Sequence, residues 1–196
     1  MAVYGGVEWL EHAISAGILV AVTDGSYICE IYPNLCLAAF MLECSKGCGR
    51  VFGSFLEALM VANAYRGELL GLTAIHLILL SVNKINPTLL GSIEVVLDCL
   101  GALKRITYLP PYRIPSQCRH SDILKTIMVH CHGLSFTTHY SHIKVHQNDQ
   151  NLFSKLSRKA QLNCICNHTA KQWIASDGLN KQQHVGCSCL NLLACL

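Results

Sequence analysis

The stretch GILVAVTDG, residues 17–25, sets the fold class of this chain. It is an apolar run rich in β-forming residues that ends at an Asp-Gly pair, which predicts a strand with an acid at its C-terminal end. Two more strands are predicted at residues 36–44 (CLAAFMLEC) and 50–57 (RVFGSFLE), joined by the glycine-containing turn SKGCG. Three successive strands with short connections predict an antiparallel meander.

The second half of the chain changes to alternating helices and strands. Residues 64–82 (AYRGELLGLTAIHLILLSV) are apolar almost all round, as expected for a helix packed across a sheet, and Asn86-Pro87 ends the pattern. Strands are also predicted at 92–98 and 136–145, and helices at 99–106, 121–133 and 154–174. Ser121 and Ser154 are the candidate N-terminal caps of the last two helices. Because the later strands follow helical crossovers, they should pair in parallel. The prediction is an α/β fold with a five-stranded mixed sheet, three antiparallel strands first and then two parallel ones, with helices on both faces.

Composition supports one sizeable domain. The chain has 196 residues, of which 52% are hydrophobic and 14% charged, so it can form a core and is not of the disordered class. We expect a leader or short helix at residues 1–16, the main domain at 17–174, and a Cys-rich tail of uncertain structure at 175–196. The longest apolar stretch, 69–82, is too short for a bilayer-spanning helix and is interpreted as a core helix.

The N-terminal segment and the cysteines bear on where the protein works. The opening MAVYGGVEWLEHA carries acids where a secretory signal needs an apolar run, so we expect an intracellular protein, in the cytoplasm or nucleus. The chain has 12 cysteines but no Cys-x-x-Cys pair, and they are interpreted as reduced, mostly buried thiols, with a metal site as the alternative. We expect a monomer that does not enter membranes.

Three acids occupy the ends of predicted elements. Asp24 and Asp98 each end an apolar strand, and Glu68 begins the long helix. Ligand sites in open α/β sheets lie beyond the carboxyl ends of the strands, so these acids could converge on one edge. Carboxylate oxygens suit Mg²⁺. Each acid alone is more simply a turn or cap residue, but their joint placement favours a metal site.

Five segments in this order carry a family resemblance: AVTDGSY, AYRGELLGL, IEVVLDCLGAL, HIKVHQND and LNCICNHTAK. They resemble the ribonuclease H domain of retroelement polyproteins, most closely the segments that follow reverse transcriptases in eukaryotic retrotransposons. The resemblance covers roughly residues 17–174 and implies a ribonuclease H-like fold. It also implies hydrolysis of the RNA strand of RNA/DNA hybrids by an Asp-Glu-Asp-Asp tetrad holding two Mg²⁺ ions, with Mn²⁺ as a substitute.

The resemblance assigns roles position by position. Asp24, Glu68 and Asp98 correspond to the first three metal-binding acids, and His146 to a mobile histidine that assists product release or proton transfer. The residues expected to contact nucleic acid are Ser26, Lys104, Arg105, Lys144 and Asn163. The implied partners are an RNA/DNA hybrid and a reverse transcriptase domain, or a separate reverse transcriptase acting in trans.

The last motif departs from the family pattern. Its register runs Asn163, Asn167, Ala170, so the fourth acid is replaced by its amide, and the affinity for a second cation should fall. Asp149 is a weaker candidate for a substitute acid. Two functions stay open: a ribonuclease H with reduced activity, or an inactive module, left from a decayed retroelement, that binds nucleic acid or a protein. An unrelated α/β domain that matches by chance would have its three acids far apart.

Overall fold

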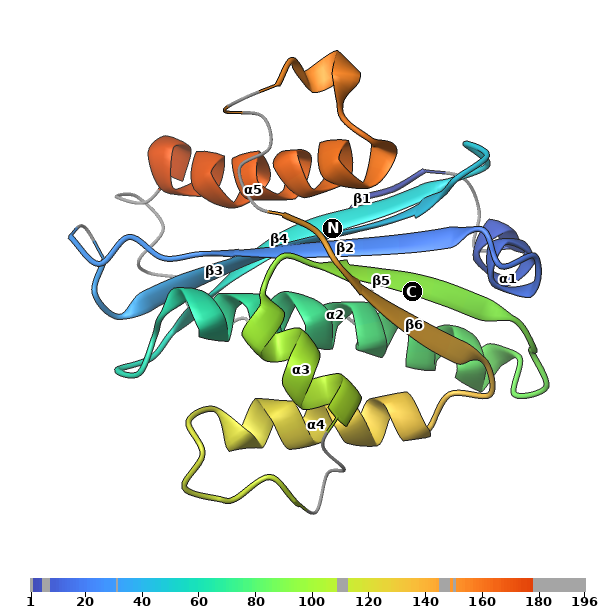
Figure 1. Cartoon of the computed structure of the whole chain (residues 1–196), viewed down its shortest axis with the longest axis horizontal. Coiled ribbons are helices and arrows are strands. Elements are labelled where there is room, and N and C mark those ends of the chain that lie inside the picture. The colour runs from blue at the N-terminus through green and yellow to red at the C-terminus, as the bar shows by residue number, and fades with distance from the viewer. Residues whose placement is uncertain are drawn as a thin grey trace.

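The computed structural model describes residues 2–4, 8–30, 32–108, 113–144, 149 and 151–177. One mixed sheet runs through the molecule in the strand order β1-β4-β3-β2-β5-β6 (Figure 1). The strands are β1 (Ala2–Tyr4), β2 (Leu19–Ser26), β3 (Leu35–Cys44), β4 (Arg50–Ala58), β5 (Ser92–Leu97) and β6 (Thr137–His142). The helices are α1 (Glu8–Ser15), α2 (Ala64–Ile85), α3 (Leu100–Tyr108), α4 (Ser121–His132), the short 3-10 helix η3 (Phe153–Lys155) and α5 (Arg158–Asp177).

The pairing of the five main strands confirms the predicted fold class. β2 pairs antiparallel with β3, and β3 with β4, which is the predicted meander. β5 pairs in parallel with β2 on one side and with β6 on the other. The short strand β1 was not predicted, and it extends the sheet by pairing antiparallel with β4.

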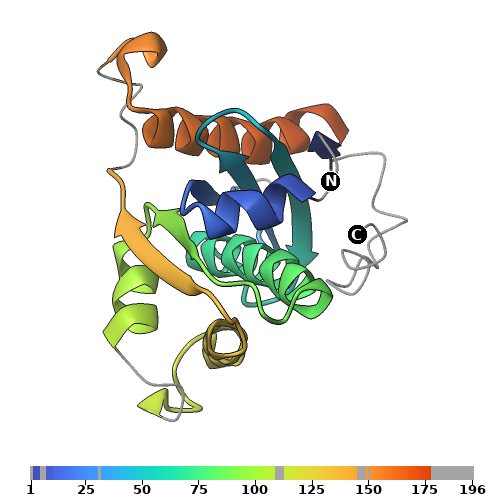
Figure 2. The same ribbon diagram turned by 90° about the vertical axis from the view of Figure 1, so that its right-hand side faces the viewer.

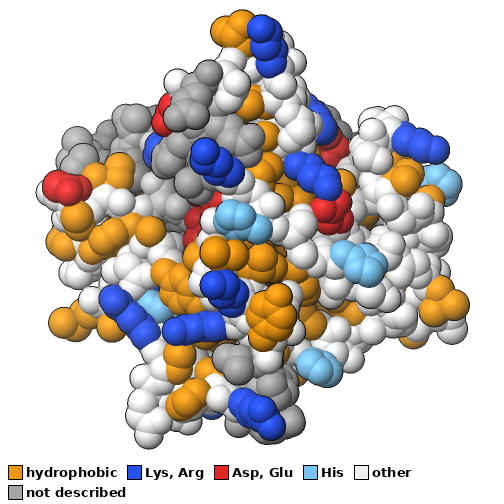
Figure 3. All heavy atoms as spheres, viewed as in Figure 1, with side chains coloured by type: hydrophobic (Ala, Val, Ile, Leu, Met, Phe, Trp, Pro, Cys, Tyr) orange, Lys and Arg blue, Asp and Glu red, His pale blue; other side chains and the backbone are white. Residues whose placement is uncertain are grey.

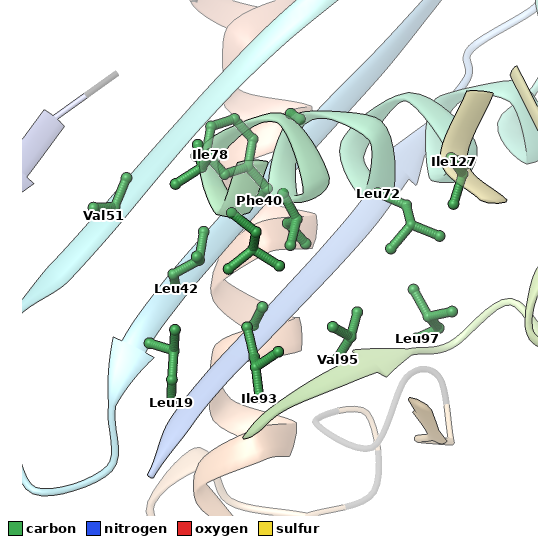
Figure 4. Packing of buried hydrophobic residues seen from close by; sticks show 14 of the residues in the cluster. Leu19, Phe40, Leu42, Val51, Leu72, Ile78, Ile93, Val95, Leu97 and Ile127 are labelled. Atoms are coloured by element: carbon green, nitrogen blue, oxygen red, sulfur yellow. The ribbon is translucent and has the colours of Figure 1, made fainter. Parts of the chain in front are cut away.

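Alternating side chains of the central strands contribute to two apolar layers, one on each face of the sheet. In β3, Phe40 and Leu42 point into the larger core with α1, α2 and α4, whereas Ala39 and Met41 pack on the other face with α5. Figures 1 and 2 show this arrangement, with α5 across one face of the sheet and α2 across the other. Figure 4 shows the larger core between β2, β3, β5 and α2. Because successive side chains of a strand point to opposite faces, the same strands contribute to both core layers.

Helix α1 belongs to the larger core. Four of its residues are buried there: Trp9, Leu10, Ala13 and Ile14. Of the two alternatives for residues 1–16, a leader or a short helix, the structure shows a helix at Glu8–Ser15.

Helix α2 is the central helix of the larger core. The Asn63 side chain caps its N-terminus by accepting a hydrogen bond from the backbone N–H of Arg66 (2.8 Å). By length and hydropathy α2 could cross a membrane, but 67% of its most apolar window is buried inside the protein. Its apolar side chains therefore face the protein's own core, as predicted for residues 69–82.

One cysteine expectation is wrong. Cys44 and Cys48 were expected to be reduced, but they form a disulfide across the turn between β3 and β4. The hairpin brings their Cα atoms to 5.6 Å, within the range that a disulfide requires. Two cysteines four residues apart do not by themselves indicate a disulfide, because it is the hairpin that brings these two thiols together.

Candidate metal centre at the carboxyl ends of two parallel strands

Three acidic side chains meet at one edge of the sheet. Asp24 lies near the C-terminal end of β2, Asp98 directly follows β5, and Glu68 lies in the second turn of α2. β2 and β5 are parallel neighbours, so their carboxyl ends reach the same edge. Ligand oxygens of the three carboxylates all lie within 4.8 Å of one another. The three acids are therefore brought together, as the element order predicted, which argues against a chance match of motifs.

Two glycines allow α2 to approach β2 closely enough for this contact. The backbone N–H of Gly25 donates a hydrogen bond to Oε1 of Glu68 (2.7 Å). A Cβ atom at Gly25 would lie 2.3 Å from the backbone nitrogen of Glu68, and a Cβ atom at Gly67 would lie 2.5 Å from the carbonyl oxygen of Leu37. Any larger residue at either position would push the helix, and Glu68 with it, away from Asp24.

The carboxylates are held in an unfavourable electrostatic environment. Burial, followed by the negative charge of Asp98, raises the pKa of Asp24 to about 7. Burial is also the main cause that raises the pKa of Glu68 well above its usual value and raises the pKa of Asp98. Oδ2 of Asp24 and Oε2 of Glu68 are buried without a hydrogen-bond partner among the described residues. Unpaired buried oxygens and mutual repulsion both disfavour the ionised cluster unless a cation is present.

The donor set fits a hard divalent cation. Three carboxylates supply oxygen ligands only, and two of them keep a free oxygen after their internal contacts. Mg²⁺ is usually bound through one or two carboxylates and several waters, and Mn²⁺ accepts the same ligands. The structure therefore fits the Mg²⁺ expectation through its chemistry, and the roles of these acids as ligands stay a prediction.

Helix α5 covers the cluster from the other face of the sheet. Nδ2 of Asn163 donates a hydrogen bond to Oδ2 of Asp98 (3.2 Å), and the Asn163 side chain is buried. This contact helps to fix the orientation of the Asp98 carboxylate. The predicted contact between Asn163 and nucleic acid stays a prediction.

Asn167 lies on the same side of α5 as Asn163. Residues four apart lie one above another on a helix, and Asn163, Asn167 and Lys171 follow that spacing. Asn163 bonds to Asp98, and the positive charge of Lys171 lowers the pKa of Asp24. Half-buried Asn167 therefore lies between two residues that act on the cluster, and its role as a fourth ligand stays a prediction. The exposed Asp149 is not part of this cluster.

The remaining predicted residues are spread around the site. Ser26 ends β2 and is buried, whereas Lys104 and Lys144 are exposed. Arg105 lies over the ring of Tyr65, 5.7 Å from its centroid, and donates a hydrogen bond to Sγ of Cys118 (3.1 Å). His146 falls outside the described residues.

Sequence reasoning missed two features beside the carboxylates. The first is Cys166, a fully buried thiol whose pKa is raised by burial and then by the charges of the three acids. The sequence marks this cysteine only by its position directly before Asn167. The second is a recess of about 560 Å³ beside the N-terminus of α2. Its lining residues are Tyr27, Asn63, Ala64, Tyr65, Gly101, Arg105, Arg119 and His120.

Comparison with known proteins identifies the fold. No protein-family model and no curated protein matches the chain. Among solved structures, the prototype foamy virus protease-reverse transcriptase matches with a TM-score of 0.55 and 18% identity over 81% of this chain. The chain spans 21% of that protein's length. The ribonuclease H domain from the same virus matches with a TM-score of 0.52 and 18% identity, covering 79% of this chain and 93% of the domain.

A ribonuclease H1 gives the same result. LC11-RNase H1, isolated from compost by a metagenomic approach, matches with a TM-score of 0.55 and 11% identity. The match covers 81% of this chain and 99% of that one. Identities this low establish a shared fold and nothing finer. The chain therefore has a ribonuclease H-like fold with a three-carboxylate cluster at the carboxyl ends of β2 and β5.

Proposed function

We propose that this chain is a ribonuclease H-type endonuclease that hydrolyses the RNA strand of RNA/DNA hybrids, with activity limited by Asn167. The observation that carries the proposal is the convergence of Asp24, Glu68 and Asp98 within 4.8 Å on a ribonuclease H-like sheet. A structural role alone does not account for three mutually repelling acids of which two keep unpaired, buried oxygens.

The chain's own residues prepare this cluster for divalent cations. Asp24, Glu68 and Asp98 would hold them, while the Gly25 N–H and the Asn163 amide keep two of the carboxylates in place. When bound, Mg²⁺ or Mn²⁺ would activate a water molecule and stabilise the leaving oxygen of the RNA phosphodiester. Because the pKa of Asp24 is about 7, cation binding at neutral pH should displace protons from the cluster.

Asn167 limits how much positive charge the cluster can balance. Its amide oxygen is a neutral ligand, so the site has three formal negative charges to offset two divalent cations. The affinity for the second cation should therefore be low, and activity should need high cation concentrations.

Basic and aromatic side chains near the cluster support nucleic-acid binding. The recess beside the N-terminus of α2 combines Arg105 and Arg119 with Tyr27 and Tyr65, and exposed Lys104 lies on α3. Figure 3 shows Lys and Arg side chains spread over this side of the molecule, with hydrophobic side chains between them. Such a surface suits contacts to phosphates and 2′-hydroxyls, the groups by which hybrids are recognised with little sequence preference.

A reverse transcriptase is the proposed protein partner. The foamy virus neighbour is a protease-reverse transcriptase, and its counterpart of this chain makes up about a fifth of its length. We place the reverse transcriptase either in the same polyprotein or as a separate chain, and a eukaryotic retrotransposon as the source stays part of this proposal.

The test is cleavage of end-labelled RNA in three forms: in an RNA/DNA hybrid, single-stranded, and in an RNA duplex. Wild type should cut the hybrid in Mg²⁺ or Mn²⁺, and Asp24→Asn should abolish cutting because it removes a charge from the cluster. Asp149→Asn is the matched control, since it removes an exposed acid outside the cluster. Equal cutting by folded Asp24→Asn and wild type would disprove the assigned site.

Asn167 favours one alternative, an inactive ribonuclease H-like module that binds nucleic acid or a protein partner. Such a module would bind the hybrid with micromolar or tighter affinity in the presence of Mg²⁺ but leave it uncut at all cation concentrations. Fluorescence anisotropy on the same labelled hybrid separates this case from a chain that does not bind hybrids.

A further inference from the structure

Two ion pairs attach the first turn of α5 to the sheet. Nζ of Lys159 lies 2.6 Å from Oε1 of Glu94 on β5. Nε and Nη2 of Arg158 each donate a hydrogen bond of 2.7 Å to a different carboxylate oxygen of Glu43 on β3. Because β2 lies between β3 and β5, consecutive residues of α5 reach strands on opposite sides of β2. We call these two ion pairs the α5 clamp.

The two glutamates of the α5 clamp lie in one row of the sheet. Val20 of β2 is paired with Glu43 in β3 and with Glu94 in β5. Each glutamate also has a partner within the sheet, because Nε of Arg50 donates to Glu43 (2.7 Å) and the hydroxyl of Ser141 donates to Glu94 (2.8 Å). The sheet therefore holds both carboxylates in place, and α5 attaches to them as fixed points.

This row lies on the same strand and the same face as part of the carboxylate cluster. Side chains two residues apart on a strand share a face, so Val20, Val22 and Asp24 all lie on the face of β2 that α5 covers. Further along α5, Asn163 donates its hydrogen bond to Asp98 (3.2 Å). One strand and one helix therefore both extend from the α5 clamp to the carboxylates.

The apolar contacts of α5 are poorly suited to fix its position along the sheet. Apart from Leu162, the apolar residues that it buries are small, namely Ala160, Cys166 and Ala170. Small side chains form shallow ridges, so their packing resists sliding and rotation of the helix only weakly. The two cations of the α5 clamp are about half exposed, so their ion pairs contribute little to stability by themselves. Their fixed geometry can instead specify the position that the small residues leave open.

We propose that the α5 clamp positions Asn163 and Asn167 over the carboxylates and thereby sets the affinity of the cluster for its divalent cation. Arg158 and Lys159 act through the helix, so they are positioning residues and not ligands. Groups that orient the ligands of a metal contribute to its affinity even though they do not touch it. The inference rests on the proposed role of the carboxylate cluster as a cation site.

Charge alone predicts an effect of the opposite sign. Lys159→Glu replaces a cation with an anion, and more negative surroundings attract Mg²⁺ more strongly. In our proposal the same substitution repels Glu94, releases the first turn of α5 and weakens the contact between Asn163 and Asp98. Mg²⁺ affinity should then fall by about threefold to tenfold, less than the roughly 10–100-fold effect of losing a group bonded directly to a ligand.

The experiment titrates the full chain with Mg²⁺ and records the nitrogen NMR signal of the Asn163 side-chain amide before any cation is added. Lys159→Glu should weaken Mg²⁺ binding and shift this signal. Combining it with Glu94→Lys exchanges the two charges and should restore both. Lys155→Glu is the matched control, because it makes the same charge change at an exposed lysine of η3 and should neither weaken Mg²⁺ binding nor shift the signal. If Lys159→Glu does not fold, Lys159→Met removes the same ion pair without adding repulsion.

A folded variant that keeps the wild-type Asn163 signal would overturn the proposal, as would one that is less stable but binds Mg²⁺ as tightly as wild type. So would a charge exchange that restores neither property. Because the Asn163 signal is measured without cation or nucleic acid, it does not depend on hybrid cleavage. Wild type that binds no Mg²⁺ would overturn the cation site and the proposed nuclease together with this role of the α5 clamp, whereas failure of the clamp alone would leave both standing.

Discussion

At the scale of single residues, the carboxylate cluster depends on a glycine, which contributes through its backbone and through its lack of a side chain. The Gly25 N–H holds Glu68, and the absence of a Cβ at Gly25 lets α2 approach β2. The sequence signal at this place was the Asp-Gly pair, which predicted only the end of a strand. The glycine therefore contributes to the site as directly as the acid before it.

Gly25→Ala should separate α2 from β2. The added Cβ would meet backbone atoms, which cannot move aside as a flexible side chain can, so the free energy of unfolding should fall by about 1–3 kcal/mol. Gly101→Ala is the control, because its Cβ would meet only Tyr65 at 3.7 Å, and alanine is the better helix former in α3. That variant should be neutral or more stable by up to about 1 kcal/mol. Urea unfolding measures both, and equal effects would contradict the close approach.

The raised pKa of Asp24 predicts that the free energy of unfolding of the cation-free protein depends on pH. Between the ordinary carboxyl pKa of 3.8 and about 7, the folded protein keeps a proton that the unfolded chain has lost. The contribution of Asp24 to stability therefore falls as pH rises through this window and is constant above it. Buried His76 acts in the opposite direction at low pH, because its pKa is lowered, so the effect must be isolated by a variant.

Asp24→Asn supplies that comparison in the presence of EDTA. Since the amide does not ionise, the stability of Asp24→Asn relative to wild type should increase from pH 5 to about pH 7 and then level off towards pH 8. Addition of Mg²⁺ at pH 8 should stabilise wild type and leave the variant nearly unchanged. A stability difference that is flat across this pH range would mean that Asp24 titrates at its ordinary pKa.

At the scale of elements, the periodic patterns predicted type and order well, and the ends of elements less well. The predicted final helix at 154–174 had Ser154 as its candidate cap, but α5 begins at Arg158 after the short helix η3. The hydroxyl of Ser157 accepts a hydrogen bond from the backbone N–H of Ala160 (3.3 Å). Similarly, α4 begins at Ser121, but its N-cap position is His120, whose φ of 61° is left-handed. Ser154 and Ser157 lie three residues apart, and the sequence alone does not show which of them caps the last helix.

The revised start of α5 can be tested by removing each hydroxyl. Ser157→Ala should lower the free energy of unfolding by about 1 kcal/mol, because it leaves an N-terminal backbone N–H without its acceptor. Ser154→Ala lies in the exposed η3 and should change stability by less than about 0.5 kcal/mol. The reverse ranking in thermal or urea unfolding would favour the original assignment of the cap.

At the scale of the whole molecule, features carried by local patterns were predictable and features made by tertiary contact were not. The apolar strand runs, the order of strands and helices, and the acids at the ends of elements predicted the mixed sheet and the meeting of Asp24, Glu68 and Asp98. Strand β1 has three residues and acquires its partners only by pairing with β4, so no pattern marked it.

Side-chain clusters between distant elements show the same limit. The side chains of Cys131, His76 and Tyr140 meet from three elements, and His76 and Tyr140 are 64 residues apart in the sequence. The buried thiol of Cys166 beneath the carboxylates had no signal beyond its position in α5. The sequence therefore predicted which acids form the candidate site, whereas its surroundings required the structure.

The central claim is that a ribonuclease H-like site is complete here except for the charge missing at Asn167. The most direct measurement is the rate of RNA/DNA hybrid cleavage by wild type and Asn167→Asp across a range of Mg²⁺ concentrations, with Asp24→Asn as the inactive control. We predict that Asn167→Asp cuts at least about tenfold faster, equivalent to about 1.4 kcal/mol of activation free energy, and saturates at lower Mg²⁺. A folded Asn167→Asp that cuts no faster than wild type at any Mg²⁺ concentration would contradict the claim.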